Sequence, residues 1–381
     1  MSNTIKIGFL QEFGMVDHAQ KPWDDGLRMA LDEAFEDGLV DRPIELVHTK
    51  MSGLPTGSWL DVQRAWQELA DEGVVCILGP ITSENAIALR SYIEDVGHIP
   101  TLSITGTDRW YGEWCFNINN GSLPEDPYLM ANFLALEGCR TVAVVYDRSA
   151  IGAEYRDFFR EACEFEGLEV VAEEGVAPRA TDLMEQATAA KAVSPDALAY
   201  FGLGLSVLHL NKALEALDWD PVKVMSTAFM TAPIVPEGLQ SIRGWVGCDQ
   251  YDEENLVTQD FLARFEKRYG YRPENVQSTL PYDCGAVIAR ALSKAHPMTP
   301  LGVKQGLEQV KMLPAATGGP GAVLSFAPYV RRAWLSADFI VLRQVPQELS
   351  GEVLMTGPNR TVLKHRLRPR TYTERKAAGG R

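Results

Sequence analysis

Apolar and polar positions follow two recurring patterns along the chain. Residues 5–10 form an apolar run that predicts a buried strand, and residues 22–35 carry apolar side chains at helical spacing. The order then repeats, with strands predicted at residues 44–47, 74–78 and 101–103 and helices at residues 59–70 and 83–93. Strands that alternate with helices are typical of a parallel sheet covered by helices on both faces.

The same pattern starts again after a loop at residues 119–122. We expect strands at residues 141–146, 169–172, 197–201 and 222–226, and helices at residues 128–136, 153–166, 182–192 and 207–217. Because the two halves show the same order of elements, they indicate an internal structural repeat.

The last third of the chain does not open another complete sheet. It contains a predicted strand at residues 244–248 and predicted helices at residues 259–269, 281–295 and 301–311. We therefore expect this part to return to the first lobe, with the chain crossing between lobes near residues 121, 250 and 328.

The predicted fold is α/β, with two Rossmann-like lobes whose parallel sheets are joined by a three-strand hinge. Lobe 1 comprises residues 1–121 and 250–328, and lobe 2 comprises residues 122–249 and 329–358. Ligands of open parallel sheets bind at the carboxyl ends of the strands, so a cleft between the lobes is the expected binding site.

The charge of the chain argues against nucleic acid as a partner. Its 381 residues include 36 basic and 51 acidic residues, and a net charge of −15 at pH 7 repels a phosphate backbone. The charge is also uneven, because residues 359–381 hold eight lysines or arginines and one acidic residue. We interpret this segment as a basic, disordered tail.

Other features of the sequence bear on localisation. No run approaches the roughly 20 apolar residues of a membrane span, so we expect no direct membrane insertion. The first residues lead into an apolar strand without the pattern of a secretory signal, which predicts a cytoplasmic protein as written. If a signal peptide has been removed, the expectation becomes a periplasmic or cell-surface protein. Six scattered cysteines without metal spacing favour a reducing compartment.

Six segments resemble one known family. They are IKIGFLQEFG with DGLRMALDEAF, VCILGPITSENAIALRSYIEDVGHIPTLSITGTD, VAVVYDRSAIGAEYRDFFREACEFEGLEVV, DALAYFGLGLSVLHLNKALEALDW, YDCGAVIARAL and GGPGAVLSFAP. In this order, the chain resembles the type I periplasmic solute-binding proteins of ABC transporters, in the branched-chain amino acid and amide receptor branch. The resemblance implies non-catalytic binding of a small solute by hinge closure, no cofactor, and an ABC transporter permease or a regulatory protein as partner.

Two turns of lobe 1 carry the expected ligand contacts. Thr82, Ser83 and Asn85 start a helix directly after a strand, where hydroxyls and free backbone N–H groups converge to receive an anion or a carbonyl. Ser83 alternatively serves only as the helix N-cap. Residues 103–107 follow the next strand and resemble the family's second ligand-contacting turn, with Gly106 permitting close backbone approach.

Lobe 2 departs from the pattern of the amino acid receptors. Where the resemblance implies aromatic residues, this chain has Ile151 and Leu205, and residues 225–229 provide no carboxylate for a ligand ammonium. A desolvated ammonium without a counter-charge is disfavoured, so we expect a carboxylate or an amide on an apolar body, unless Glu84 supplies the charge. The expected ligand-binding residues are Phe13, Ser83, Glu84, Asn85, Ser103, Thr105, Gly106, Thr107, Ile151, Leu205, Phe229 and Tyr251.

Competing motifs are weak. Residues 202–207 give part of a dinucleotide-binding fingerprint, but the third glycine and the later acidic residue are missing. The six histidines show no metal spacing, and no P-loop or catalytic motif is found, so we expect no catalytic residues, metal or cofactor. Tyr282 and Asp283 are expected to begin a helix, with Asp283 as a cap. Trp110, Tyr111 and Trp114 either cover the core or line the cleft.

Three functions remain open. The first is a binding protein that delivers a small apolar acid or amide to an ABC importer. The second is a cytoplasmic receptor that senses a similar ligand and regulates a partner protein. The third is an α/β enzyme with an unrecognised site, which would require a nucleophile and a base that the sequence does not reveal.

Overall fold

The computed structural model describes residues 4–12, 17–234, 238–334, 339–347 and 364–365. Internal contacts divide the chain into unit 1, Met1–Ser122 with Gln250–Phe339, and unit 2, Leu123–Asp249 with Ile340–Arg381. The third passage between units falls after Phe339, and not near residue 328 as expected. The reason is that residues 331–333 extend the sheet of unit 1: Asn117 donates its N–H to the Arg331 carbonyl and accepts from the Ala333 N–H.

Unit 1 is built on one parallel sheet of five strands. In sheet order these are β2 (Ile44–Lys50), β1 (Ile5–Gln11), β3 (Ile77–Leu78), β4 (Thr101–Ser103) and β5 (Cys115–Asn117). A separate antiparallel pair in this unit joins β11 (Leu313–Pro314) to β12 (Val323–Leu324). The expected parallel α/β lobe is confirmed for this part of the chain.

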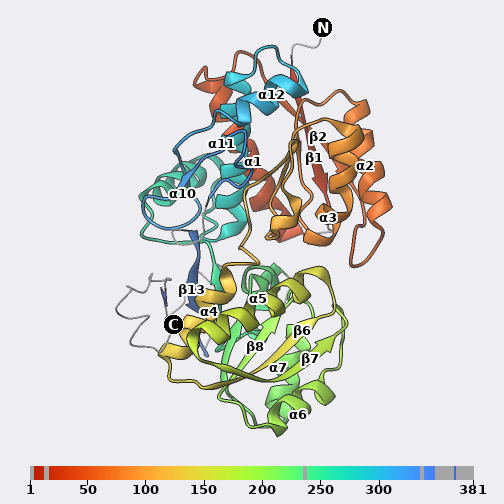
Figure 1. Cartoon of the computed structure of the whole chain (residues 1–381). Coiled ribbons are helices and arrows are strands. Elements are labelled where there is room, and N and C mark those ends of the chain that lie inside the picture. The colour runs from red at the N-terminus through yellow and green to blue at the C-terminus, as the bar shows by residue number, and fades with distance from the viewer. Residues whose placement is uncertain (1–3, 13–16, 235–237, 335–338, 348–363, 366–381) are drawn as a thin grey trace. The chain divides into compact units, whose positions relative to one another are not determined.

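Helices cover both faces of the unit 1 sheet (Figure 1). One side carries α2 (Trp59–Asp71) and α3 (Ser83–Tyr92), and the other carries α1 (Asp17–Glu36) and α11 (Val276–Lys294). The unit also contains α10 (Leu256–Tyr269), α12 (Pro300–Leu307) and the short helices η1 (Ile93–Gly97) and η2 (Asp108–Trp110). Trp110 is fully buried beneath α2 and α3, and its indole donates to the Phe116 carbonyl at 2.7 Å, so it is a core residue.

The helices α1 and α11 pack closely along their length. A side chain at Gly26 would lie 2.5 Å from the Ser278 carbonyl oxygen, and one at Gly285 would lie 2.7 Å from the Ala30 Cβ. Glycine at these two positions lets the helix backbones approach each other. Both helices also begin five residues before their prolines, Pro22 and Pro281, where the sequence predicted their start.

The early start of α11 corrects the prediction that Asp283 caps it. The N-cap is Asn275, whose side chain accepts from the Gln277 N–H. Asp283 lies inside the helix, buried, and accepts from the backbone N–H groups of Ala316 and Thr317 at 2.8 Å each. Burial, which these donors oppose, raises the pKa of Asp283 to about 7.

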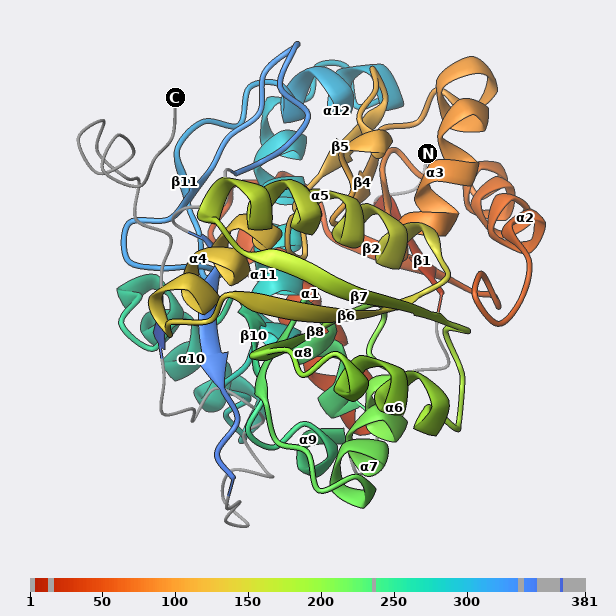
Figure 2. The same cartoon turned by 60° about the horizontal axis from the view of Figure 1, so that its bottom comes forward.

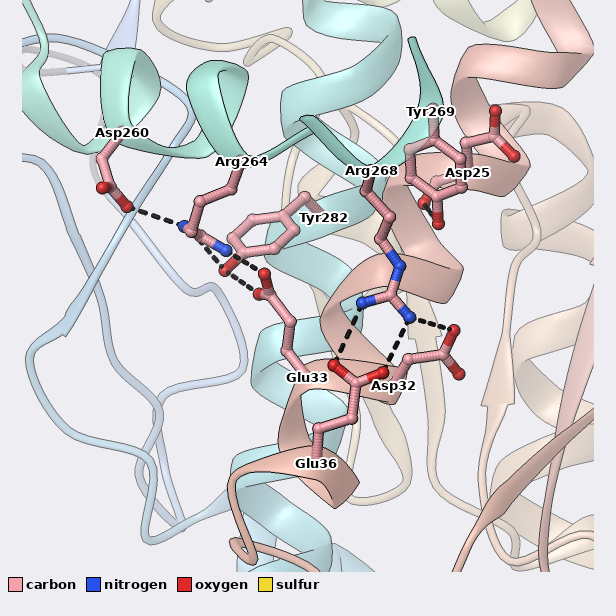
Figure 3. Close-up of polar contacts among 9 residues, drawn as sticks. All are labelled: Asp25, Asp32, Glu33, Glu36, Asp260, Arg264, Arg268, Tyr269 and Tyr282. Carbon is pink, nitrogen blue, oxygen red and sulfur yellow. Dashed lines mark hydrogen bonds and ion pairs between the residues drawn. The ribbon is translucent and has the colours of Figure 1, made fainter. Parts of the chain in front are cut away.

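Ion pairs hold α10 against α1 (Figure 3). Arg268 lies 3.0 Å from carboxylate oxygens of Asp32 and of Glu36, and it also donates a second bond to Glu36. Arg264 pairs with Glu33, and the Tyr282 hydroxyl joins both side chains from α11. This network links three helices of one face, and its exposed positions limit its contribution to stability.

Unit 2 repeats the architecture with a mixed sheet. In sheet order its strands are β14 (Lys364–His365), β13 (Val341–Gln344), β10 (Val246–Asp249), β9 (Val222–Met225), β8 (Ala197–Phe201), β6 (Thr141–Asp147) and β7 (Glu169–Val176). The expected parallel order holds from β10 to β7, but β13 and β14 are antiparallel. Of the predicted tail, residues 364–365 thus pair with β13, and the remainder lies outside the described residues.

Helices again lie on both sides of the unit 2 sheet (Figure 2). One side carries α4 (Asp126–Leu136) and α5 (Ala150–Glu166), and the other carries α6 (Met184–Ala192) and α7 (Val207–Ala216). The short helices α8 (Ala228–Thr231), η3 (Ala232–Ile234) and α9 (Gly238–Ser241) follow β9. Alternate residues of β6 and β8 face the core under α6 and α7, and the residues between them are also fully buried, so both faces of these strands are apolar.

Two observations apply to the described residues alone. No helix among them combines the length and apolar character needed to cross a membrane. They also contain no group of three or more His, Cys, Asp or Glu side chains placed to hold a metal ion. All six cysteines are free and buried, where each serves as a small apolar side chain.

Candidate functional site

The carboxyl ends of the unit 1 strands gather polar groups at one edge of the sheet. Glu12 follows β1, Thr82 precedes the first residue of α3 after β3, and Thr105 follows β4. Each of these side chains is at least nine-tenths buried. Parallel strands present their carboxyl ends at a common edge, which is where ligands of such sheets bind.

Glu12 occupies the N-terminus of α3. Its Oε2 accepts from the backbone N–H of Ile81 at 2.9 Å and of Thr82 at 2.6 Å. Among the described residues its Oε1 and the Thr82 hydroxyl make no hydrogen bond of good geometry, yet the Thr82 and Asn85 side chains lie close enough to lower the pKa of this carboxyl. Burial is the largest influence on this carboxyl, and although the donors oppose it, the pKa of Glu12 is raised to about 7.

The predicted residues of α3 take different positions from those expected. The N-cap is Thr82, and Ser83 is the first helical residue, buried, so the alternative of Ser83 as the cap is wrong. The side-chain amide of Asn85 makes two hydrogen bonds to the Leu54 backbone. Its oxygen accepts from the Leu54 N–H at 2.9 Å, and its NH₂ group donates to the Leu54 carbonyl at 3.2 Å. This places Asn85 as a clamp on the loop before α2. Glu84 lies half-buried beside it.

The turn after β4 is locked by its own hydroxyls. Ser103 donates to the Pro80 carbonyl at 2.7 Å, and its oxygen accepts from the Thr105 N–H at 3.2 Å. Asn117 of β5 donates to the Thr105 carbonyl at 2.7 Å. Thr107 caps η2 by accepting from the Arg109 N–H. The structure therefore brings Ser103, Thr105, Gly106 and Thr107 together at this edge, all buried.

Two further predicted residues belong to unit 1. Tyr251 is buried in a cluster with Phe261 and Phe265 of α10, and burial raises its pKa to about 12. Its surroundings are those of a core side chain. Phe13 lies outside the described residues.

Unit 2 has a carboxylate at the position that matches Glu12. Asp147 ends β6, is fully buried, and accepts from the Tyr200 and Ser206 hydroxyls at 3.1 and 2.6 Å through Oδ1. Its Oδ2 accepts from the Leu203 N–H at 3.0 Å. Burial and then the Asp147 charge raise the pKa of Tyr200, so this hydroxyl remains protonated and donates.

The same carboxylate explains the glycine-rich segment after β8. A Cβ at Gly202 would lie 2.0 Å from Asp147 Oδ2, and Gly204 adopts a φ of +94°. The loop therefore folds over a carboxylate of the protein itself, with its glycines where a side chain would collide or strain the backbone. This use replaces the phosphate cradle that the dinucleotide-like motif suggested.

The remaining predicted residues of unit 2 divide between edge and core. Ile151 lies in the first turn of α5, nearly buried, and Leu205 lies half-buried in the loop over Asp147. Phe229 is fully buried in the core cluster of unit 2, where its ring packs against Gly247. Beside the edge, the Tyr155 hydroxyl donates to Asp126 at 2.8 Å.

A separate pocket of about 590 Å³ lies in unit 1 where the chain enters β5. It is lined by Tyr111, Glu113, Lys304, Glu308 and Arg331 among others. Glu308 lies 3.2 Å from the Lys304 ammonium and 2.8 Å from the Arg331 guanidinium, and Lys304 also reaches Glu113 at 3.1 Å. Its four charged side chains pair with one another, and none of its lining residues belongs to the strand ends that form the candidate site.

Sequence reasoning missed the buried carboxylates Glu12, Asp126 and Asp147, which lie at or beside the strand ends. A usable signal existed for two of them, because Glu12 and Asp147 each stand at the end of the first strand of a repeated β/α pattern. Residues 225–229 contain no acidic residue, and the prediction for lobe 2 did not consider the end of β6.

Two α/β units, each with polar side chains gathered at the carboxyl edge of its sheet, define a two-lobed ligand-binding fold. The chain belongs to the periplasmic binding protein family, whose sequence model matches residues 4–332. The predicted family resemblance is therefore confirmed. No curated protein matches the chain in sequence.

Solved structures share the fold at low sequence identity. The branched-chain amino acid transporter substrate-binding protein LivJ from Streptococcus pneumoniae, solved with isoleucine, has 16% identity and a TM-score of 0.78, covering 97% of this chain and 100% of its own. A periplasmic binding protein type 1 from Bordetella pertussis Tohama I has 16% identity and a TM-score of 0.77, with coverages of 90% and 96%. A solute-binding protein from Rhodopseudomonas palustris BisB5, solved with 3,4-dihydroxybenzoic acid, has 19% identity and a TM-score of 0.73, with coverages of 90% and 93%.

Proposed function

We propose that this protein binds a small solute without catalysis and delivers it to an ABC importer. The solute carries a carboxylate or an amide on an apolar or aromatic body, and the two lobes close on it through the three connecting segments. The importer's permease is then the protein partner, and the periplasm or the cell surface is the place of action.

The observation that carries this proposal is the buried polar edge of unit 1 in a chain of this family. Hydroxyls and backbone groups from the ends of β3 and β4 converge there, around Thr82, Ser103 and Thr105. Support for the solute class comes from relatives of the same fold, one solved with isoleucine and one with 3,4-dihydroxybenzoic acid.

A thermal-shift screen tests the proposal. The purified chain is heated with aliphatic and aromatic carboxylates, their amides and free amino acids, and a solute at a hundred times its dissociation constant stabilises the protein by about 2.7 kcal/mol. Thr105→Val is expected to remove the shift while the melting temperature without solute changes little. Turnover of a bound compound would overturn the non-catalytic assignment.

A second candidate is a receptor that senses a similar solute and regulates a partner protein. The six free, buried cysteines are compatible with a reducing compartment, which is the observation that keeps this candidate. Fractionation of the native cell separates the two roles, because uptake requires the protein outside the inner membrane. Solute affinity alone does not distinguish them.

A further inference from the structure

The pocket beside the start of β5 is separate from the carboxyl edge of the unit 1 sheet. Its volume of about 590 Å³ is within the range of small-molecule sites. Glu113 in its wall comes shortly before β5, and all five strands of this sheet are parallel. This wall therefore lies at the amino end of the strand, whereas the proposed solute site lies at the carboxyl ends.

The backbone around the pocket is held by hydrogen bonds of its own. On one side, the Glu94 carboxylate accepts from the backbone N–H groups of Glu113 and Trp114 at 2.8 Å each. On another side, Ala327 and Val330 exchange two backbone hydrogen bonds and form a tight turn. The walls are thus formed before a ligand arrives, which lowers the cost of binding.

Two cationic side chains of the pocket share one carboxylate oxygen. Lys304 is 8% exposed and Arg331 is 9% exposed, and they lie 3.2 and 2.8 Å from Oε1 of Glu308. Arg331 also donates to the carbonyls of Gly112 and Ala327 at 2.8 and 2.9 Å, which fixes its guanidinium in place. Because two buried cations face one largely buried carboxylate, the interior of the pocket favours an additional anion.

The other counter-charge of Lys304 comes from an exposed side chain. Glu113 lies 3.1 Å from the Lys304 ammonium, but its side chain is 65% exposed. Ion pairs with exposed partners contribute little free energy, because water solvates the exposed carboxylate well. A carboxylate of a ligand can therefore replace Glu113 at Lys304 while Glu113 turns to solvent.

An aromatic side chain stands at the rim of the same pocket. Tyr329 lies at the tip of the turn between Ala327 and Val330, lines the pocket, and is 88% exposed. The face of an exposed aromatic ring provides a packing surface for a flat apolar group. The pocket thus combines a buried cation with an apolar platform.

We propose that this pocket is a second binding site, which takes a carboxylate carried on a flat apolar body. Lys304 binds the carboxylate in place of Glu113, and Tyr329 packs against the body. Glu308 stays between the two cations and repels a doubly charged anion, so a monocarboxylate is preferred over phosphate. A free aromatic acid and the carboxyl end of a peptide share this chemistry, and the experiment below distinguishes them. The proposal does not rest on the proposed function.

Calorimetric titration at low ionic strength tests the proposal on the Thr105→Val chain, in which binding at the carboxyl edge is expected to be lost. The probes are benzoate, as a free acid, and N-acetylphenylalanine, as the end of a peptide, with benzamide, acetate and inorganic phosphate for comparison. We expect benzoate or N-acetylphenylalanine to bind at least about fivefold more tightly than the other three, and the tighter of the two identifies the source. Salt at about 0.5 M should weaken this binding at least about threefold.

Three substitutions in the same background assign the binding to the pocket. Lys304→Met removes the ammonium and should weaken binding at least about tenfold. Glu113→Gln removes the competing charge and should strengthen binding about two- to fivefold, a gain that a purely structural role of Glu113 would not produce. Tyr329→Ala should weaken binding of the aromatic probes about threefold or more and leave acetate unchanged. Lys267→Met, at an exposed lysine of α10, is the matched control and should change nothing.

Melting temperatures are measured alongside, because Lys304 is buried. Glu113→Gln and Tyr329→Ala alter exposed side chains, so they test the proposal even if Lys304→Met does not fold. The proposal is refuted if neither probe binds, if phosphate binds best, or if folded Lys304→Met binds both probes unchanged. Equal or weaker binding in Glu113→Gln contradicts the exchange at Lys304. The proposed function is judged separately, by the thermal-shift screen of the unaltered chain.

Discussion

Glu12 in unit 1 and Asp147 in unit 2 hold equivalent positions in a repeated architecture but have opposite environments. Each carboxylate stands at the end of the first strand of its unit, with the sheet continuing on both sides. Asp147 receives two hydrogen bonds from a loop that folds over it and one from Tyr200 of β8. Glu12 receives two on one oxygen and none on the other from the described residues.

The difference lies in the segments that follow the neighbouring strands. After β8, Gly202 lets the backbone descend onto Asp147, and Ser206 and Tyr200 complete its shell. After β3, the chain turns directly into α3, which provides the backbone donors of Ile81 and Thr82 and brings the Thr82 and Asn85 side chains near the carboxyl. A buried carboxylate with well-aligned donors on both oxygens contributes more to the stability of its own unit than one with such donors on a single oxygen.

The largest effect is expected from removing the satisfied carboxylate. Asp147→Ala leaves the Tyr200 and Ser206 hydroxyls and the Leu203 N–H buried without their acceptor, which should lower the free energy of unfolding by about 3–5 kcal/mol. Urea denaturation measures it. Glu12→Gln serves as the comparison and should cost less than about 1 kcal/mol at pH 7. Equal losses of unfolding free energy in both variants would show that the two carboxylates contribute equally to stability.

The pH dependence of stability tests the raised pKa of Glu12. An acid whose pKa is higher in the folded state binds its proton more tightly there, so its contribution favours folding at low pH and is lost as pH rises from about 4.5 to about 7. The loss should approach about 3 kcal/mol. Asp283 titrates in the same range, so the measured quantity is the difference between wild type and Glu12→Gln. A difference that stays constant from pH 4.5 to 7.5 would contradict the shift.

Gly202→Ala tests whether the loop is shaped by the carboxylate beneath it. The added methyl would lie 2.0 Å from Asp147 Oδ2, and relieving this overlap should cost about 2 kcal/mol. In an Asp147→Ala background the overlap disappears, so the same substitution should cost clearly less, and a double-mutant cycle by urea denaturation measures the coupling. Additive losses would assign Gly202 another role.

The smallest effects come from single hydroxyls. Ser206→Ala removes one donor from Asp147 and should lower the free energy of unfolding by about 1 kcal/mol. Thr82→Val removes a buried hydroxyl without a partner among the described residues and should change it by less than about 0.5 kcal/mol. Thermal denaturation of the two variants side by side gives the contrast, and a larger loss in Thr82→Val would reverse it.

The fold was largely predictable because its signals are local. Buried strands such as β1, β6 and β8 are continuous apolar runs, and turns and caps separate them from amphipathic helices. The errors occur where tertiary packing overrides a local rule. Proline favours a first helical turn, yet α1 and α11 each extend one turn before their prolines, and α11 is capped there by Asn275.

The site was less predictable because its partners are distant in sequence. Asn85 has the local pattern of a ligand contact, but it bonds to Leu54, 31 residues earlier. Phe229 matched a family position, but its ring lies in the core of unit 2. Acidic residues are mostly exposed in folded proteins, so a sequence gives little reason to expect a buried one. Only the strand-end position of Glu12 could have suggested a buried carboxylate.

The packing of α1 against α11 also determines when during translation α1 can be fully buried. The glycine-bearing face of α1 around Gly26 finds its partner only when Gly285 has been made, about 260 residues later. At a translation rate of about 5–20 residues per second, this surface of α1 remains without α11 for roughly 13–50 s during synthesis. Unit 2, whose strands from β6 to β10 are contiguous in the chain, can assemble most of its sheet in that interval. The face of α1 around Gly26 thus stays without its α11 partner until late in the synthesis of unit 1.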